Sequence, residues 1–160
     1  MQVSTSKTKK VIGRAEAIAL PELGSAEVSA RIDTGAKTSS IWASHLREEN
    51  GVLHFTLFDT PSVHYTGRVH RTSEFERVIV ANSTGQEQER YKVRLLIKLK
   101  GKKIRGRFTL ADRSTQAYPV LVGRNVLRGK FIVDVTRGKP LYQEERERSE
   151  QLQSKLEAKD

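Results

Sequence analysis

The 160-residue chain contains no cysteine, few aromatic residues and no long apolar run. Without cysteine it can form neither a disulfide framework nor a thiolate zinc site, and thiol catalysis is excluded. No apolar stretch approaches the roughly 20 residues that a membrane-spanning helix needs. The first ten residues, rich in Ser, Thr and Lys, lack the apolar core of a signal peptide. We therefore expect a protein of a reducing compartment, the cytoplasm, with no membrane contact.

Other chemistries are disfavoured because their motifs are missing. The sequence has no glycine-rich loop of the Gly-x-x-x-x-Gly-Lys-Ser/Thr type for a nucleotide and no Gly-x-Ser-x-Gly elbow for a serine nucleophile. Its four histidines are scattered and none stands in His-Glu-x-x-His spacing, so a zinc site is weakly supported: they are His45, His54, His64 and His70. We expect no metal and no cofactor.

Positive charge is what the chain has in excess. Lys and Arg number 29 against 19 Asp and Glu, a formal charge of +10. Nine of these cations and no acid lie within residues 90–107: Arg90, Lys92, Arg94, Lys98, Lys100, Lys102, Lys103, Arg105 and Arg107. Their alternation with apolar residues is typical of a hairpin with one buried and one wet face. That face either is merely solvated and discourages edge pairing, or it guides an anionic partner to the protein.

The length of the chain favours one domain. Residues 1–10 are expected to be flexible, 11–142 to form the folded domain, and 143–160 to be a charged tail, helical or disordered. Turn formers separate many short runs of β-type pattern, which indicates an all-β barrel or sandwich. The predicted strands are 11–20, 26–32, 52–58, 63–69, 78–81, 91–99, 104–110, 120–122 and 131–135. Apart from the tail, only 124–127 is predicted to be helical.

One tripeptide offers catalytic chemistry. After the strand at 26–32 comes Asp33-Thr34-Gly35, in which the glycine allows a tight turn and the close approach of another chain. Asp and Gly are also common in ordinary turns, and by chance this tripeptide should occur in roughly one chain of this length in thirty. The tripeptide alone is therefore only suggestive.

A second motif strengthens the first. Residues 118–125, Tyr-Pro-Val-Leu-Val-Gly-Arg-Asn, form an apolar strand that ends in glycine and opens a helical turn. With 20–24, 30–40 and 110–113, residues 119–127 occur in the order found in bacterial retropepsin-like proteases of the RimB type, and the chain resembles that family. The resemblance implies a closed, single-lobe, retropepsin-like β-barrel of the acid-protease fold. The family is often labelled as ATP-dependent zinc proteases, but nothing in this sequence supports ATP or zinc.

The resemblance implies that Asp33 is the catalytic acid and base, framed by Thr34 and Gly35. Amide hydrolysis without a metal or a nucleophile needs a water activated between two carboxylates, one ionised and one protonated. This chain has a single Asp-Thr-Gly and no internal repeat. The second carboxylate must then come from another copy, in a two-fold homodimer.

Further residues receive roles by the same resemblance. A flap over the substrate would be the hairpin 78–93, with Ser83, Thr84 and Gly85 at its tip and Ala36 opposite; the alternative is a surface hairpin with no covering role. Gly123, Arg124 and Asn125 would support the catalytic loop. Arg124 is expected to brace that loop through an acidic residue, but this chain has Lys37 and Thr38 there. Arg124 is thus left to a different carboxylate or to solvent.

The leading functional hypothesis is an aspartic endopeptidase acting on acidic peptide. Lys98, Lys100 and Lys102 would capture the substrate electrostatically. The association of the family with glutamate-adding ligases makes poly-glutamyl tails attractive substrates and implies a functional link to such a ligase. One alternative is a basic β-barrel that binds RNA or ribosomes, although only Tyr91 and Phe108 flank the cationic run and nucleic-acid binding should be non-specific. Another is a protease-derived binding module.

Overall fold

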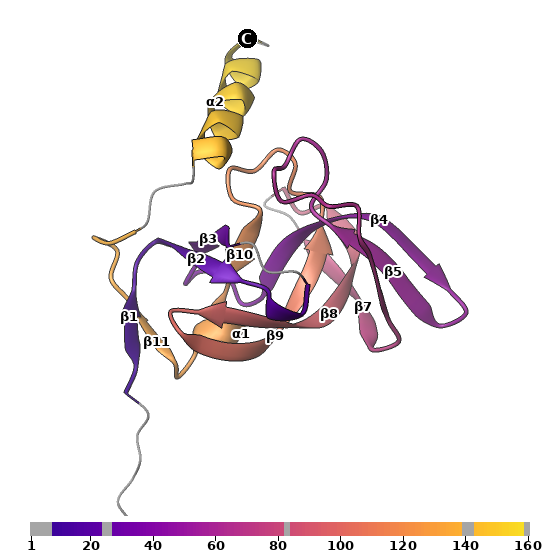
Figure 1. The fold of residues 1–160 in the computed structure, drawn as a ribbon, viewed down its shortest axis with the longest axis horizontal. Helices are drawn as coiled ribbons and strands as arrows, with labels where there is room; N and C mark the ends of the chain where they lie inside the picture. Colours follow the sequence, from indigo (N-terminus) through magenta and orange to yellow (C-terminus); the bar gives the residue numbers. More distant parts are fainter. Residues whose placement is uncertain (1–7, 24–26, 82–83, 139–142, 159–160) are drawn as a thin grey trace, which may run out of the picture.

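The computed structural model describes residues 8–23, 27–81, 84–138 and 143–158. Within this part of the chain strands predominate (Figure 1). The strands are β1 (Lys10–Ile12), β2 (Ala15–Ala19), β3 (Val28–Ile32), β4 (Ser39–Glu49), β5 (Val52–Leu57), β6 (Val69–Thr72), β7 (Phe75–Ala81), β8 (Glu87–Leu99), β9 (Lys102–Ala111), β10 (Val120–Val122) and β11 (Phe131–Val133). The helical elements are the 3-10 turn η1 (Pro21–Leu23), α1 (Arg124–Leu127) and α2 (Gln143–Ala158).

Six strands close into a barrel in the order β10-β3-β2-β8-β9-β4, because β10 pairs with both β3 and β4. The pairings β10–β3 and β4–β9 are parallel, and the other four in the ring are antiparallel. The all-β, retropepsin-like closed barrel that the motifs predict is confirmed. Closure brings three segments together at one corner: the end of β3, the start of β4 and the end of β10.

The alternation of β8 and β9 supplies much of the core. On β8, Val93, Leu95, Ile97 and Leu99 are at most 6% exposed, while Arg94 and Lys98 are exposed. The predicted division into one buried and one wet face is therefore confirmed. Burying such a side chain contributes about 1.5–3 kcal/mol, so the core anchors the cationic side chains that lie on the opposite face of the same strands.

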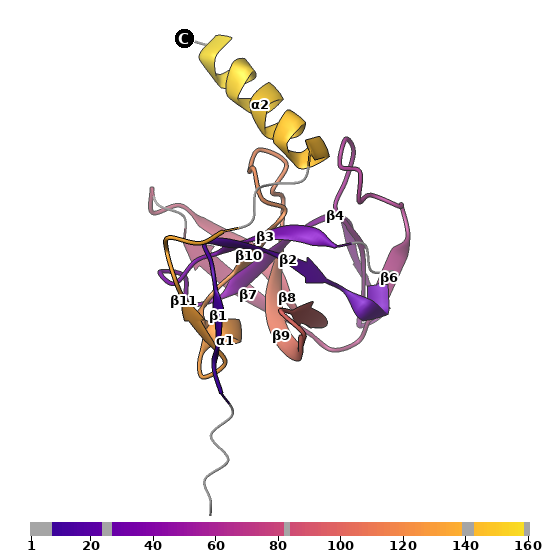
Figure 2. The same ribbon diagram turned by 60° about the vertical axis from the view of Figure 1, so that its left-hand side comes forward.

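Two hairpins and one small sheet extend the barrel. The first hairpin, β4–β5, continues into β6, and the second is β7–β8 (Figures 1 and 2). β1 and β11 form a separate parallel pair. The helix α2 projects away from the barrel in both views. Among the described residues, no helix is long and apolar enough to cross a membrane.

Several sequence predictions are corrected. The strand predicted at 11–20 is broken at Gly13, where a Cβ atom would lie 2.4 Å from the carbonyl carbon of Arg137. The strand predicted at 63–69 is wrong except for Val69, since Ser62 and Thr66 hydrogen-bond nearby backbone amides and favour a loop. Strand β4 was not predicted at all. The tail, predicted to be helical or disordered, forms α2 over its described residues.

Candidate active site

The loop that carries Asp33 begins where β3 ends. The backbone N–H of Asp33 donates to the Val122 carbonyl of β10 over 2.9 Å, which continues the parallel pairing beyond β3. The N–H of Gly35 donates to Oδ1 of Asp33 over 2.9 Å. Among the described residues Oδ2 of Asp33 has no hydrogen-bond partner. One carboxylate oxygen is therefore fixed, and the other remains available to a water or a second carboxyl group.

Gly123 allows the strand β10 to turn against this loop. A Cβ atom at position 123 would lie 2.2 Å from the Thr38 carbonyl oxygen and 2.8 Å from that of Ala36. Because no side chain intervenes, the first amides of α1 reach the loop: Arg124 N–H donates to the Ala36 carbonyl over 2.8 Å, and Asn125 N–H to that of Lys37 over 3.2 Å. Amides at a helix start that lack an intrahelical partner are thereby satisfied.

Ser39, to which no role was assigned from the sequence, links the start of β4 to the end of β10 and to α1. Its side chain is fully buried and its Oγ accepts a hydrogen bond from Gly123 N–H over 2.9 Å. The same hydroxyl donates to Oδ1 of Asn125 over 2.7 Å, and Nδ2 of Asn125 donates to the Arg107 carbonyl over 2.9 Å. The only signal in the sequence was the position of Ser39 inside the motif stretch 30–40. The predicted support residues Gly123 and Asn125 thus lie against the Asp33 loop.

Arg124 braces the loop by a different bond from the one expected. Its Nη1 donates to the Thr34 carbonyl over 3.1 Å, so a backbone oxygen takes the place of a carboxylate. The sequence had left Arg124 to a different carboxylate or to solvent; among the described residues it forms no ion pair. The guanidinium contacts the residue next to Asp33, and therefore restrains the Asp-Thr-Gly turn directly.

The predicted flap corresponds to the β7–β8 hairpin. Its pairing runs from Phe75 opposite Val93 to Ala81 opposite Glu87, so the hairpin starts three residues earlier than predicted. Ser83 lies outside the described residues. Thr84 and Gly85 are exposed at the tip, and Gly85 has a φ of +82°, which suits a tight hairpin turn. Their covering role, and the contact of Ala36 with substrate, stay predictions.

A polar cluster ties the flap hairpin to the neighbouring hairpin. Arg77 of β7 forms an ion pair with Glu48 of β4, and the Tyr91 hydroxyl of β8 donates to Oε2 of Glu48 over 3.1 Å. Hydrogen bonding to Arg77 lowers the pKa of Glu48 and raises that of Arg77. The cluster fixes the middle of the flap hairpin relative to the end of β4.

Arg113 is affected by the charges of two arginines from other elements, Arg31 and Arg90. Arg113, which follows β9, donates from Nε to the Tyr118 carbonyl over 3.0 Å. Burial, with smaller contributions from the charges of Arg90 and Arg31, lowers the pKa of Arg113 to about 10. Arg31 stands two residues before Asp33, and Arg90 belongs to the flap strand β8. Sequence reasoning missed this arrangement because the three positions are far apart along the chain.

The predicted capture lysines are divided by the structure. Lys98 and Lys100 line one hollow together with Lys103. Lys102 instead points toward β11, where its Nζ donates to the Lys130 carbonyl over 3.3 Å and lies 5.6 Å from the centre of the Phe131 ring. Lys103 lines this hollow and Lys102 does not, and the capture role of these lysines stays a prediction. Among the described residues no cluster of three or more His, Asp or Glu could hold a metal ion.

Comparison with known proteins agrees with this architecture. Residues 11–141 match the family model described as RimB-like, retropepsin-like aspartic endopeptidase RimB. The chain belongs to this family. The resemblance inferred from the motifs is thereby confirmed.

The chain is also similar to longer curated proteins. It is 31% identical over 136 residues to a probable alpha-L-glutamate ligase of Desulfotalea psychrophila, covering 82% of this chain and 29% of that protein. With the protein of the same name from Shewanella halifaxensis the identity is 30% over 151 residues, covering 92% and 33%. The RimB-like chain therefore spans about a third of the length of these relatives.

Among solved structures, a protein of unknown function from Legionella pneumophila has a similar fold. It superposes with a TM-score of 0.62 at 28% identity, covering 82% of this chain and 97% of that one. The RimB-like barrel thus corresponds to nearly the whole of that structure.

Proposed function

We propose that this RimB-like chain is an aspartic endopeptidase whose active site forms between two copies, each contributing Asp33. The observation that carries the proposal is the Asp33 loop itself. One carboxylate oxygen is fixed by Gly35, and Arg124, Asn125 and Ser39 hold the surrounding backbone. A peptidase of this class needs a carboxylate held firmly in an accessible turn, and Thr34 and Gly35 are exposed.

The dimer follows from the single Asp-Thr-Gly of the chain. A self-complementary two-fold interface places the same loop of both copies face to face. The β1–β11 sheet supports this arrangement because it carries exposed apolar side chains, with Val11 37% and Ile132 54% exposed. The chain passes from this sheet to the site, since the carbonyl of Arg14, two residues after β1, accepts the N–H of Ile32 beside Asp33 over 2.8 Å. We expect the dimer to work in the cytoplasm.

In such a dimer the two carboxylates share one proton, because neighbouring like charges disfavour double ionisation. The ionised carboxylate takes a proton from water as the water oxygen attacks the peptide carbonyl carbon. The protonated carboxyl group gives its proton to the carbonyl oxygen, which forms a tetrahedral diol. The newly protonated carboxyl group then gives its proton to the amide nitrogen while the other carboxylate takes a proton from a diol hydroxyl. The C–N bond breaks, a carboxylic acid and an amine leave, and the pair again shares one proton.

Acidic peptides are the proposed substrates, poly-glutamyl segments among them. Arg31, Arg90 and Arg113 give the surroundings of Asp33 and the flap strand a positive potential that suits carboxylate side chains. The longer relatives are named probable alpha-L-glutamate ligase, and this name supports glutamate-containing peptides as the substrates. We propose that this chain is functionally linked to such a ligase.

The test compares the wild type with Asp33→Asn on glutamate-rich peptides, with products identified by mass spectrometry. The amide keeps the shape of the carboxyl group but cannot shuttle a proton, so cleavage should fall by at least about a thousandfold. Asp59→Asn is the matched control, because Asp59 starts the other Asp-Thr pair and likewise accepts a local backbone N–H, that of Thr60 over 2.9 Å. It should retain wild-type turnover.

Light scattering after size exclusion should show a dimer in the active preparation. Undiminished cleavage by purified Asp33→Asn would refute the aspartic mechanism. A strict monomer that still cleaves peptide would refute the shared site.

A further inference from the structure

The outer face of the β8–β9 hairpin is a row of positive charges. Residues that pair across two antiparallel strands lie on the same face of the sheet. The side chains of β8 and β9 that point away from the core therefore form one surface. We define the cationic face by its six charged members: Lys92, Arg94, Lys98, Lys103, Arg105 and Arg107. No acidic residue belongs to either strand on this face between residues 92 and 107.

The cationic face is only partly neutralised. Arg105 pairs with Glu22 at 2.8 Å and Arg107 with Glu76 at 3.5 Å. The other four, Lys92, Arg94, Lys98 and Lys103, have no ion pair among the described residues.

The register also sets like charges directly opposite each other, Arg94 across from Arg107 and Lys98 across from Lys103. Such cross-strand pairs of like charge are destabilising. A bound anion would relieve that repulsion at both positions.

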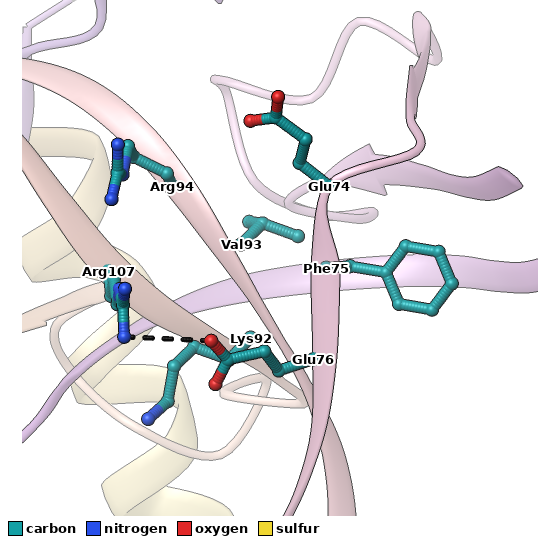
Figure 3. A pocket seen from close by; sticks show the side chains of 7 residues that line it. All are labelled: Glu74, Phe75, Glu76, Lys92, Val93, Arg94 and Arg107. Atoms are coloured by element: carbon teal, nitrogen blue, oxygen red, sulfur yellow. Dashed lines mark ion pairs between the residues drawn. The ribbon is translucent and has the colours of Figure 1, made fainter.

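Two hollows border the unpaired cations. Lys92, Arg94 and Arg107 line one of about 290 Å³ beside Glu74 and Glu76, and Figure 3 shows the two arginine side chains next to each other. The second, of about 590 Å³, lies between β2 and the β8–β9 turn and is lined by Lys98, Lys100 and Lys103 together with Glu16 and Glu27. Lys100 pairs with Glu16 at 3.8 Å, whereas Lys98 and Lys103 form no ion pair among the described residues. No residue of the Asp33 loop lines either hollow. The cations therefore belong to a surface separate from the candidate catalytic loop.

We propose that the cationic face is an exosite that binds an acidic stretch of polypeptide away from the bond to be cleaved. Its use in substrate capture rests on the proposed peptidase function, whereas the binding itself does not. From Lys92 to Lys98 the strand spans about 20 Å, so an extended acidic segment of about six residues can reach both hollows. Alternate side chains of such a segment repeat at the same spacing as those of the strand beneath it.

The composition of the face favours a polypeptide over a nucleic acid. Glu22 and Glu76 interrupt the row and leave two separated groups of free cations, while a phosphate backbone carries charge at every step. The face also lacks aromatic side chains on which unpaired bases could stack. Acids also line the two hollows, Glu74 and Glu76 the first and Glu16 and Glu27 the second. A flexible acidic segment can place its carboxylates at the free cations and turn its other residues away from these acids.

The experiment measures binding without cleavage. The probe is a fluorescein-labelled peptide of ten glutamates, titrated by anisotropy into full-length Asp33→Asn protein. Lys98→Gln with Lys103→Gln, added to that background, should weaken binding about tenfold, the sum of two exposed charge contacts. The matched control is Lys102→Gln with Lys155→Gln, which removes the same charge from a lysine turned toward Phe131 and from one on α2. It should bind within about twofold of the parent.

Raising the salt from 0.1 to 1 M should abolish the difference, since the Debye length falls from about 10 to 3 Å. Equal loss in both double variants would show that only net charge matters and would overturn the exosite. So would an RNA oligonucleotide of equal charge that binds as tightly and depends on the same lysines. If the glutamate peptide binds as expected but the wild type cleaves no peptide, the proposed peptidase function is refuted. The proposal that the cationic face binds acidic segments is then still supported.

Discussion

The corner that holds Asp33 and the cationic face of β8–β9 are built in opposite ways. At the corner, Ser39 and Gly123 are buried, and neutral hydrogen bonds of 2.7–3.3 Å fix the backbone. On the face, Lys98 and Lys103 are exposed and have no ion pair among the described residues. Short bonds to buried groups give positional accuracy, which a catalytic carboxylate requires. Exposed charges act over distance and tolerate movement, which suits capture.

The largest effect is expected from a side chain added at position 123, which would disrupt the corner that holds Asp33. In Gly123→Ala the new Cβ would lie 2.2 Å from the Thr38 carbonyl oxygen, a backbone atom that cannot move alone. We expect the free energy of unfolding, measured with urea, to fall by about 3 kcal/mol and turnover to be lost.

Gly138→Ala is the matched control for this change. Its Cβ would meet nothing closer than 3.5 Å, so stability and activity should change little. A fully stable and active Gly123→Ala protein would contradict the close approach of β10 to the loop.

A smaller and more selective effect is expected from Ser39→Ala. The variant leaves the Gly123 N–H and the side-chain Oδ1 of Asn125 without the hydroxyl that they share, at a cost of about 1–3 kcal/mol. Because the loop backbone loses its support, kcat should fall, whereas the KM for acidic peptides should keep its salt dependence.

Ser44→Ala separates stability from positioning. Ser44 lies on the same strand and donates to the Phe58 carbonyl over 2.6 Å, away from the Asp33 loop. It should lose comparable stability and keep its kcat. If both variants lower kcat equally, Ser39 has no specific positioning role.

The two regions also differ in how far the sequence predicts them. The alternation of apolar and charged residues over 91–99 and 104–110 predicts the hairpin and its solvent-exposed face, because the polarity of each side chain indicates whether it is buried or exposed. The corner depends on contacts between residues 39, 107, 123 and 125, and such contacts leave no local pattern. Strand β4 was not predicted because its first two residues, Ser39 and Ser40, are polar although they are buried. A strand that is buried on both faces is normally recognised by a continuous apolar run, which these two residues interrupt. The sequence did not show that Lys102 and Lys103 lie on opposite faces of β9, because the turn at residues 100–101 sets the register in which Lys103 pairs with Lys98 and Lys102 with Leu99.

The smallest predicted effect concerns the cluster of Glu48, Arg77 and Tyr91, which connects the β7–β8 hairpin to β4. In this cluster charged side chains form the hydrogen bonds, whereas neutral groups form them at the corner that holds Asp33. Hydrogen bonding to Arg77 lowers the pKa of Glu48 below its ordinary value of 4.5. A carboxyl group with a lowered folded-state pKa contributes stability above its ordinary value and loses it as the pH falls through the folded-state value. Urea unfolding should therefore show Glu48→Gln less stable than the wild type at pH 7, with the difference shrinking below pH 4.5. In Glu49→Gln, which removes an exposed partner of Arg47 on the same strand, the difference at pH 7 should be smaller, since that pair joins no second hairpin. A Glu48→Gln difference that persists unchanged into acid would show that shape, and not charge, holds the flap hairpin to β4.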